Sequence, residues 1–206
     1  MKSVIVLGGG GHASVLIDAL TCCGTKVAGV CDPKIKRGTM ILQGVRCLGS
    51  EEVLDSKSKD TTLLVNGLGS TRSTLARRDL FLKFKREGFK FLNVVHPSAV
   101  ISSRVSLGEG VHIMAGCVLQ TEVVVGDNVI VNTGATIDHH CNIGAHSHVA
   151  PGVTISGNVQ IGGGSHIGAG AVVVQSLKIG RDSFVRSGSV VVDHIPDGGI
   201  VPSPIK

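Results

Sequence analysis

The 206-residue sequence contains no tryptophan and no tyrosine, and its aromatic residues are five phenylalanines. Binding platforms for single-stranded nucleic acid stack bases on aromatic rings, so this composition argues against that function. Charged residues make up 17% of the chain, below the usual share of about 25%. Because 42% of the residues are hydrophobic, intrinsic disorder is also excluded.

Long apolar segments are missing as well. No stretch of about 18 apolar residues runs without a charge, so we expect no membrane span. The first apolar run, Val4–Leu7, is too short for a secretory signal. The six cysteines form no zinc-type CxxC pair, which favours a reduced, cytoplasmic location and no metal. A net charge of +5 suits anionic small ligands at least as well as nucleic acid.

The chain changes character near residue 94. Before that point, short hydrophobic runs alternate with segments in which apolar residues recur at helical spacing. The runs predict strands at 4–7, 26–31, 62–65 and 89–94, and the helical spacing predicts helices at 13–20 and 75–86. We therefore predict an α/β, Rossmann-like half-fold over residues 1–93. The basic residues of the second helix, Arg77 among them, are expected to form a solvated face.

From Val95 to Val191, a valine, isoleucine or leucine recurs every six residues without interruption. Two glycine columns recur every 18 residues; they are Gly108, Gly126, Gly144, Gly162 and Gly180, and Gly116, Gly134, Gly152, Gly170 and Gly188. Three six-residue segments therefore make one coil, and we expect both columns at corners with positive φ. This pattern resembles the left-handed parallel β-helix of hexapeptide-repeat proteins, which we predict over residues 94–206.

Four consecutive glycines, Gly8 to Gly11, stand between the first predicted strand and the first predicted helix. They leave backbone N–H groups at a helix N-terminus, where phosphate binds favourably. With Ala13 and Asp32 the spacing also fits a dinucleotide fingerprint, so a dehydrogenase is an alternative. A part of about 93 residues is half a dinucleotide fold, which favours a mononucleotide or a nucleotide sugar.

Three histidines occupy equivalent positions before inward aliphatic residues of the repeat: His112, His148 and His166. Neighbours on adjacent coils would lie about 4.8 Å apart. Converging imidazoles could hold a metal ion, which keeps a metalloenzyme as a further alternative. We instead expect His112, His146 and His166 to be exposed surface residues.

Residues 130–149 read IVNTGATIDHHCNIGAHSHV and resemble the catalytic coil of nucleotide-sugar acetyltransferases. The matching positions are Asn132, Thr133, His139, Ile143, Gly144, His148 and Gly157. The Gly10-Gly11-His12, Asp32-Pro33 and His96-Pro97-Ser98-Ala99 segments match too, so the resemblance covers essentially the whole chain. It implies N-acetylation of a nucleotide-linked 4-amino-4,6-dideoxy sugar, with acetyl-CoA as cosubstrate.

The resemblance assigns catalysis to His139, as general base, and to His140. The family often carries a carboxylate at the latter position, which leaves open what orients His139. The acetyl-CoA contacts it implies are His148, Gly157, Ala169 and Ser187. The nucleotide-sugar contacts it implies are Gly10, Gly11, His12, Asp32, Pro33 and Gly67. It also implies a homotrimer in which His139 faces a neighbouring subunit.

Imidazole suits this chemistry because its ordinary pKa, about 6.5, lets it take a proton near neutral pH. The sugar amine would then attack the thioester, and a backbone N–H near Gly157 would stabilise the oxyanion. Two alternatives stay open. One is an O-acetyltransferase of sialic-acid-type sugars, which share the same pattern, and the other is a non-catalytic, nucleotide-binding β-helix scaffold.

Overall fold

The computed structural model describes residues 2–203, so the last three residues of the 94–206 range fall outside it. Its N-terminal part is a sheet in the order β3-β4-β2-β1-β5-β6. The strands are β1 (Ser3–Leu7), β2 (Val27–Cys31), β3 (Met40–Leu42), β4 (Val45–Gly49), β5 (Thr62–Asn66) and β6 (Lys90–Phe91). The pairings are parallel except for the β3–β4 hairpin, which the sequence analysis did not predict.

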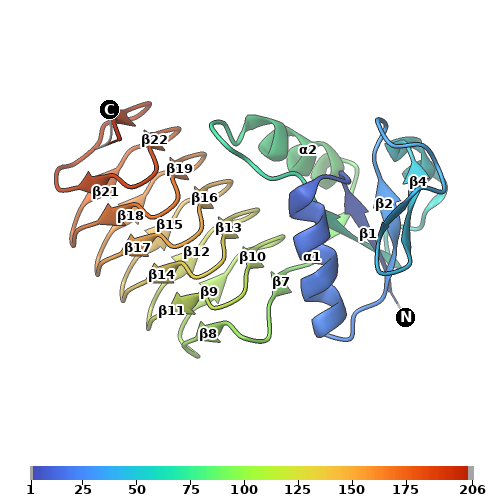
Figure 1. The fold of residues 1–206 in the computed structure, drawn as a ribbon, viewed down its shortest axis with the longest axis horizontal. Coiled ribbons are helices and arrows are strands. Elements are labelled where there is room, and N and C mark those ends of the chain that lie inside the picture. Colours follow the sequence, from blue (N-terminus) through green and yellow to red (C-terminus); the bar gives the residue numbers. More distant parts are fainter. Residues whose placement is uncertain (1, 204–206) are drawn as a thin grey trace.

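The helices of this part are α1 (Gly11–Cys22) and α2 (Leu75–Arg86), with a short 3₁₀ helix, η1 (Glu51–Ser56). Side chains of a strand alternate between the two faces of a sheet. In β1, Ile5 therefore packs with Phe81 of α2, whereas Val6 packs with Leu16 of α1. The two helices thus cover opposite faces, and α1 lies beside the start of the repeat region (Figure 1).

The repeat region forms a prism with three faces of parallel two-residue strands (Figure 1). The first face holds β7 (Val94–Val95), β10 (His112–Ile113), β13 (Ile130–Val131), β16 (His148–Val149), β19 (His166–Ile167), β22 (Phe184–Val185) and β24 (Ile200–Val201). The second face holds β8 (Val100–Ile101), β11 (Val118–Leu119), β14 (Thr136–Ile137), β17 (Thr154–Ile155), β20 (Val172–Val173) and β23 (Val190–Val191). The third face holds β9 (Ser106–Leu107), β12 (Val124–Val125), β15 (Asn142–Ile143), β18 (Gln160–Ile161) and β21 (Lys178–Ile179).

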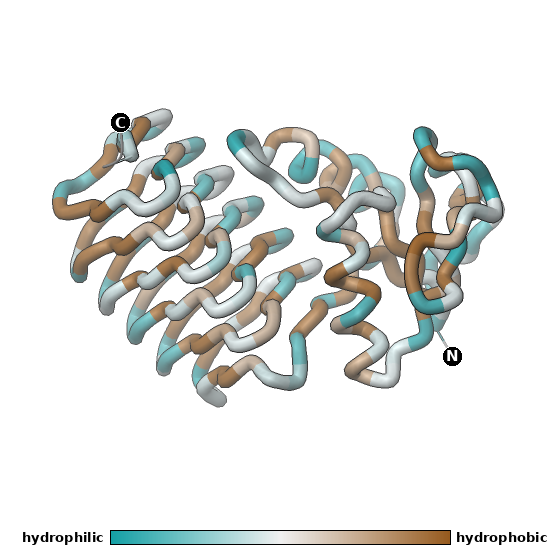
Figure 2. Tube along the Cα trace, in the orientation of Figure 1, coloured by the Kyte–Doolittle hydropathy of each residue, from teal (hydrophilic) through white to brown (hydrophobic). Residues whose placement is uncertain are grey.

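The six-residue period places one aliphatic side chain of each strand inside the prism. Ile137, Ile143 and Val149 come from three successive faces, and all three are fully buried. A single hydrophobic cluster continues from this interior into α1, and the hydrophobic segments are visible along each coil in Figure 2. The prediction of one strand over 89–94 was wrong, because the chain leaves the sheet after Phe91 and enters the first face at Val94.

The two glycine columns serve different purposes. The column that begins at Gly116 has φ values between +66° and +70°, as predicted for a corner. The column that begins at Gly108 does not have positive φ, so that part of the prediction was wrong. Its glycines are required by close stacking instead: a Cβ on Gly126 would lie 2.6 Å from the amide nitrogen of Ala145 on the next coil.

Candidate active site

A cavity of about 570 Å³ lies between the N-terminal part and the first face of the prism. Its lining comes from the β1–α1 turn, the start of α1, the loop after β5 and two prism residues; it comprises Gly10, Gly11, His12, Val15, Gly67, Leu68, Gly69, Ser70, Thr71, Ser73, Asn132 and His148. Pockets for small organic ligands have this size. The structure therefore brings together five of the predicted binding residues: Gly10, Gly11, His12, Gly67 and His148.

The glycine turn forms one wall of the cavity. Gly8 has a φ of +89°, and α1 begins at Gly11 with no side-chain cap, so its first N–H groups remain available to an anion. Asp32 supports this turn from behind, because its Oδ2 accepts a hydrogen bond from the Gly9 N–H at 2.8 Å. Pro33 instead lines a separate cavity together with η1 and α2.

The expectation that the first-face histidines are exposed was wrong. His112 is fully buried and His166 is 5% exposed, because the N-terminal part covers this face. His146 is partly buried, and its ring packs edge-on against Phe81 of α2. Nε2 of His12 lies 3.1 Å from Nδ1 of His112, which links the cavity to the buried face.

His148 is held between the two parts of the molecule. Its Nδ1 lies 2.7 Å from Oγ of Ser70, and its Nε2 lies 3.2 Å from Nδ2 of Asn132. An amide nitrogen only donates, so Nε2 of His148 accepts and Nδ1 carries the proton. Burial, with a contribution from His166, lowers the pKa of His148 to about 3, which keeps the ring neutral at physiological pH.

Arg77 contradicts the prediction of a solvated basic face. Its side chain is 1% exposed and points from α2 into the junction between the N-terminal part and the prism. The guanidinium donates to the carbonyl oxygens of Asn66 at 2.7 Å and Leu68 at 2.8 Å, and to that of Asn128 at 3.3 Å. It therefore ties the loop that lines the cavity to the first coils of the prism.

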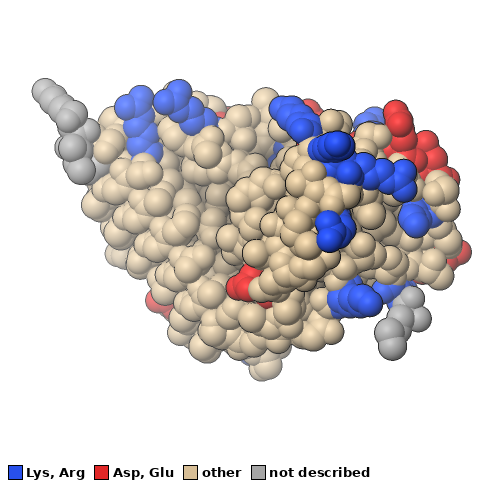
Figure 3. Space-filling model, turned by 45° about the vertical axis from the view of Figure 1, so that its right-hand side comes forward, with Lys and Arg blue, Asp and Glu red and all other residues tan. Residues whose placement is uncertain are grey.

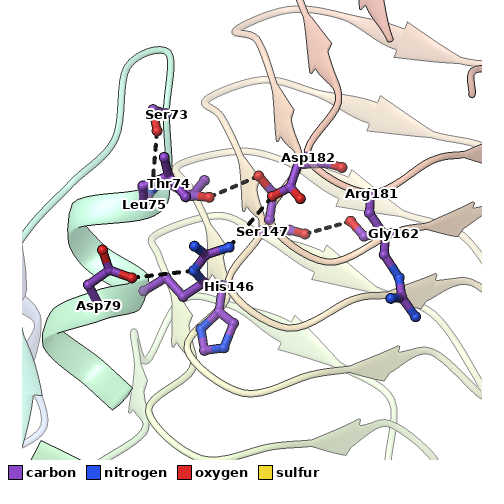
Figure 4. A network of polar contacts seen from close by, with 12 residues as sticks. Ser73, Thr74, Leu75, Asp79, His146, Ser147, Gly162, Arg181 and Asp182 are labelled. Atoms are coloured by element: carbon purple, nitrogen blue, oxygen red, sulfur yellow. Dashed lines mark hydrogen bonds and ion pairs between the residues drawn. The ribbon is translucent and has the colours of Figure 1, made fainter. Parts of the chain in front are cut away.

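The start of α2 is attached to a prism corner by a second polar network (Figure 4). Oγ1 of Thr74 donates to the carbonyl oxygen of Gly164 at 2.8 Å. Arg78 lies 3.8 Å from the carboxylate of Asp182 on the next coil. These contacts fix the loop after β5, and hence Ser70, over the first face.

His139 and His140 lie elsewhere, at the corner between the second and third faces. Their Nδ1 atoms are 2.9 Å apart, and Nε2 of His140 lies 3.3 Å from Oε2 of Glu122. Glu122 occupies the same corner one coil earlier. The sequence analysis missed it, although the 18-residue repeat places it below His140.

The contacts from Glu122 to His140 and from His140 to His139 define which nitrogen of His139 carries the proton. The Glu122 carboxylate only accepts, so neutral His140 carries its proton on Nε2 and accepts through Nδ1. His139 must then donate from Nδ1, which leaves its Nε2 as an acceptor with no hydrogen-bond partner among residues 2–203. The ring lies over Gly157, where an added Cβ would come 2.7 Å from that Nε2.

The two remaining predicted residues, Ala169 and Ser187, lie at the corner between the first and second faces. They are one coil apart, joined by the bond from the Gly188 N–H to the Ala169 carbonyl oxygen at 2.9 Å. Both are exposed, and Ser187 lines a second cavity of about 570 Å³ with Arg72 and Arg186. A single chain thus distributes the predicted acetyl-CoA contacts over the first face, which holds His148, and two different corners.

Charge is distributed unevenly between the two parts. Of the 20 lysines and arginines, 5 follow residue 93 and 15 precede it. Figure 3 accordingly shows most of the prism surface in view without charged side chains. Within residues 2–203, no group of three or more histidine, cysteine or acidic side chains is placed to hold a metal ion. None of the helices in that range is long and apolar enough to cross a membrane.

A half-Rossmann sheet with a glycine turn, joined to a β-helix that carries histidines at its corners, defines a class of sugar acetyltransferases. Residues 3–79 match the PglD N-terminal domain family. Over its whole length, the chain superposes with a TM-score of 0.91 on a histidine-to-asparagine variant of perosamine N-acetyltransferase from Caulobacter crescentus, in complex with CoA and GDP-perosamine. The two are 36% identical, and the alignment covers 96% of that chain.

Two further relatives agree with this assignment. The acetyltransferase domain of PglB from Neisseria gonorrhoeae FA1090, in complex with acetyl coenzyme A, is 33% identical over 97% of this chain and 95% of its own, with a TM-score of 0.88. UDP-N-acetylbacillosamine N-acetyltransferase of Bacillus subtilis (strain 168) is 34% identical over 127 residues, 56% of this chain and 52% of that protein. The chain belongs to the hexapeptide-repeat nucleotide-sugar acetyltransferase family, and the predicted fold class is confirmed.

Proposed function

We propose that the protein transfers the acetyl group of acetyl-CoA to the amino group of a nucleotide-linked 4-amino-4,6-dideoxy sugar. In this proposal residues 1–93 hold the nucleotide sugar and residues 94–206 bind acetyl-CoA. The observation that carries it is the cavity between the glycine turn and the first face, in a chain similar over its full length to an enzyme solved with CoA and GDP-perosamine.

The corner geometry supports His139 as the general base. The amine nitrogen attacks the thioester carbonyl, and its proton passes to the free Nε2 of His139. The tetrahedral intermediate then collapses, the C–S bond breaks, and the proton passes on to the CoA sulfur. His140 and Glu122 hold His139 in the tautomer that this step needs. A backbone N–H near Gly157 is the oxyanion donor in this proposal.

One chain does not complete this site. The cavity lies over the first face, whereas His139 lies at the corner opposite that face, between the second and third faces. A site that contains both must therefore combine two chains, which supports the homotrimer expected for the family. The six free cysteines support a cytoplasmic location, where thiols stay reduced.

The test is thiol release from acetyl-CoA by the purified protein with UDP-, dTDP- and GDP-linked 4-amino sugars. We expect release with at least one of them and loss of release in a His139→Ala variant. If thiol is released only with sialic-acid-type sugars, whose acceptor is a hydroxyl group, the protein is an O-acetyltransferase and the proposal is wrong. Absence of release with every acceptor would favour the non-catalytic scaffold.

A further inference from the structure

The junction between the N-terminal part and the prism contains a buried cation without a carboxylate partner among the described residues. Arg77 donates to three carbonyl oxygens, and its remaining contact is from the Nη2 atom to Nδ1 of His112, at 3.4 Å. Burial lowers the pKa of Arg77 to about 9, so the guanidinium stays charged at neutral pH. A fully buried charge of this kind constrains every polar group around it.

The first group it constrains is His112. A guanidinium has no acceptor atom, so Nδ1 of His112 must face Arg77 with its lone pair. The neutral ring then carries its proton on Nε2. That atom is buried and has no hydrogen-bond partner within the described residues. The unpaired N–H is unfavourable, and His112 retains it because the alternative would direct an N–H at a cation.

The constraint passes from His112 to His12. The single lone pair of His112 Nδ1 is shared in a three-centre hydrogen bond between Nη2 of Arg77, at 3.4 Å, and Nε2 of His12, at 3.1 Å, so Nε2 of His12 must donate. Neutral His12 therefore has its lone pair on Nδ1. His12 lines the cavity, and its Nδ1 forms no hydrogen bond with the described residues.

We infer that Arg77 and His112 are positioning residues that hold His12 in the Nε2-protonated tautomer, so that its Nδ1 is a hydrogen-bond acceptor for a donor group of the bound nucleotide sugar. This inference rests on the proposed function for the identity of the ligand. The tautomer itself follows from geometry within one chain. The cavity would favour a ligand with an N–H or O–H at this point over one with a carbonyl oxygen.

The test compares His112→Leu, which removes the acceptor, with His112→Asn, whose side-chain oxygen can replace Nδ1. Imidazole ¹⁵N spectra, assigned with a His12→Gln variant, report the tautomer without any need for activity. We expect His12 to carry its proton on Nε2 in the wild type and in His112→Asn, and to lose this preference in His112→Leu. A wild-type His12 protonated on Nδ1 would overturn the inference, even if neither variant folds.

Steady-state kinetics provide the second measurement. His112→Leu should raise KM for the nucleotide sugar by about fivefold, the effect of one hydrogen bond, while KM for acetyl-CoA and kcat stay unchanged. His112→Asn should restore the wild-type KM. Equal KM values in folded His112→Leu and wild type would contradict the role in binding. If no nucleotide sugar is acetylated, the proposed function fails, whereas the tautomer measurement still decides this inference.

Discussion

Two pairs of histidines in this molecule each contact a charged side chain, and the two charges have opposite sign. His12 and His112 lead from the cavity to the Arg77 guanidinium, whereas His139 and His140 lead from the prism corner to the Glu122 carboxylate. A cation forces the adjacent ring nitrogen to accept, and a carboxylate forces it to donate. The far histidine consequently presents Nδ1 in the first pair and Nε2 in the second. Opposite charges thus leave one free acceptor at the end of each pair.

The surroundings of the two pairs differ as well. Desolvation lowers the pKa of His12 to about 3 and that of His112 well below its usual value, so the first pair stays neutral. The second pair lies on an exposed corner, where the side chains of His140 and Glu122 are 56% and 41% accessible. Binding a neutral ligand group suits the first environment, and exchanging protons suits the second. The comparison therefore predicts different kinetic effects for the two pairs.

The largest effect should come from His139→Ala. Removal of a general base costs about 10²- to 10⁴-fold in kcat. His12→Ala, by contrast, should mainly raise KM for the nucleotide sugar, by about tenfold. Steady-state kinetics of both variants, with melting temperatures as the folding control, separate the two roles. A His139→Ala enzyme with kcat close to the wild-type value would remove the distinction between the pairs.

Gly157→Ala should have the next largest effect, because the new methyl group would lie 2.6 Å from Cε1 of His139. Displacing the ring without removing it should lower kcat by about thirtyfold. Ser156→Ala, at the adjacent position, is the control and should change kcat less than twofold. A Gly157→Ala variant as active as the control would show that the ring position is not critical.

Glu122→Gln should have a smaller effect. Glutamine both donates and accepts, so it no longer dictates which nitrogen of His140 carries the proton. We expect kcat to fall by about tenfold, equal to about 1.4 kcal/mol. The control is Arg104→Gln, which removes only the exposed ion pair to Glu122 and should cost less than about threefold. Equal kcat values for Glu122→Gln and the control would show that the Glu122 carboxylate does not fix the tautomers of His140 and His139.

The sequence predicted the prism well because each coil repeats a local rule, an inward aliphatic every six residues, and needs no information from distant residues. It also identified the glycine turn that forms the cavity wall. The burial of Arg77, His112 and His166 was not predictable in this way, because it results from docking the N-terminal part on the first face. Glu122 was missed for a related reason: its contact with His140 joins adjacent coils rather than adjacent residues.

Burial of the first-face histidines also predicts an acid-sensitive stability, the smallest effect considered. His148 has a pKa of about 3 when folded and about 6.5 when unfolded, so the unfolded chain binds more protons below pH 6.5. Its contribution to stability is therefore complete above pH 6.5 and is lost as the pH falls toward 3. Between pH 6.5 and 5.5 this one group should remove about 1 kcal/mol of unfolding free energy.

Urea unfolding at fixed protein concentration tests this sign. His148→Asn should unfold with a shallower pH dependence than the wild type, by the same 1 kcal/mol or so over that interval. Ile130→Val, a buried and non-titratable neighbour on the first face, should lower stability equally at both pH values. His148→Asn could instead lower the free energy of unfolding by the same amount at both pH values, as Ile130→Val does. The His148 ring would then have the same pKa in the folded chain as in the unfolded chain. The N-terminal part would then not seal the first face from water, and the contrast between the two histidine pairs would rest on charge alone.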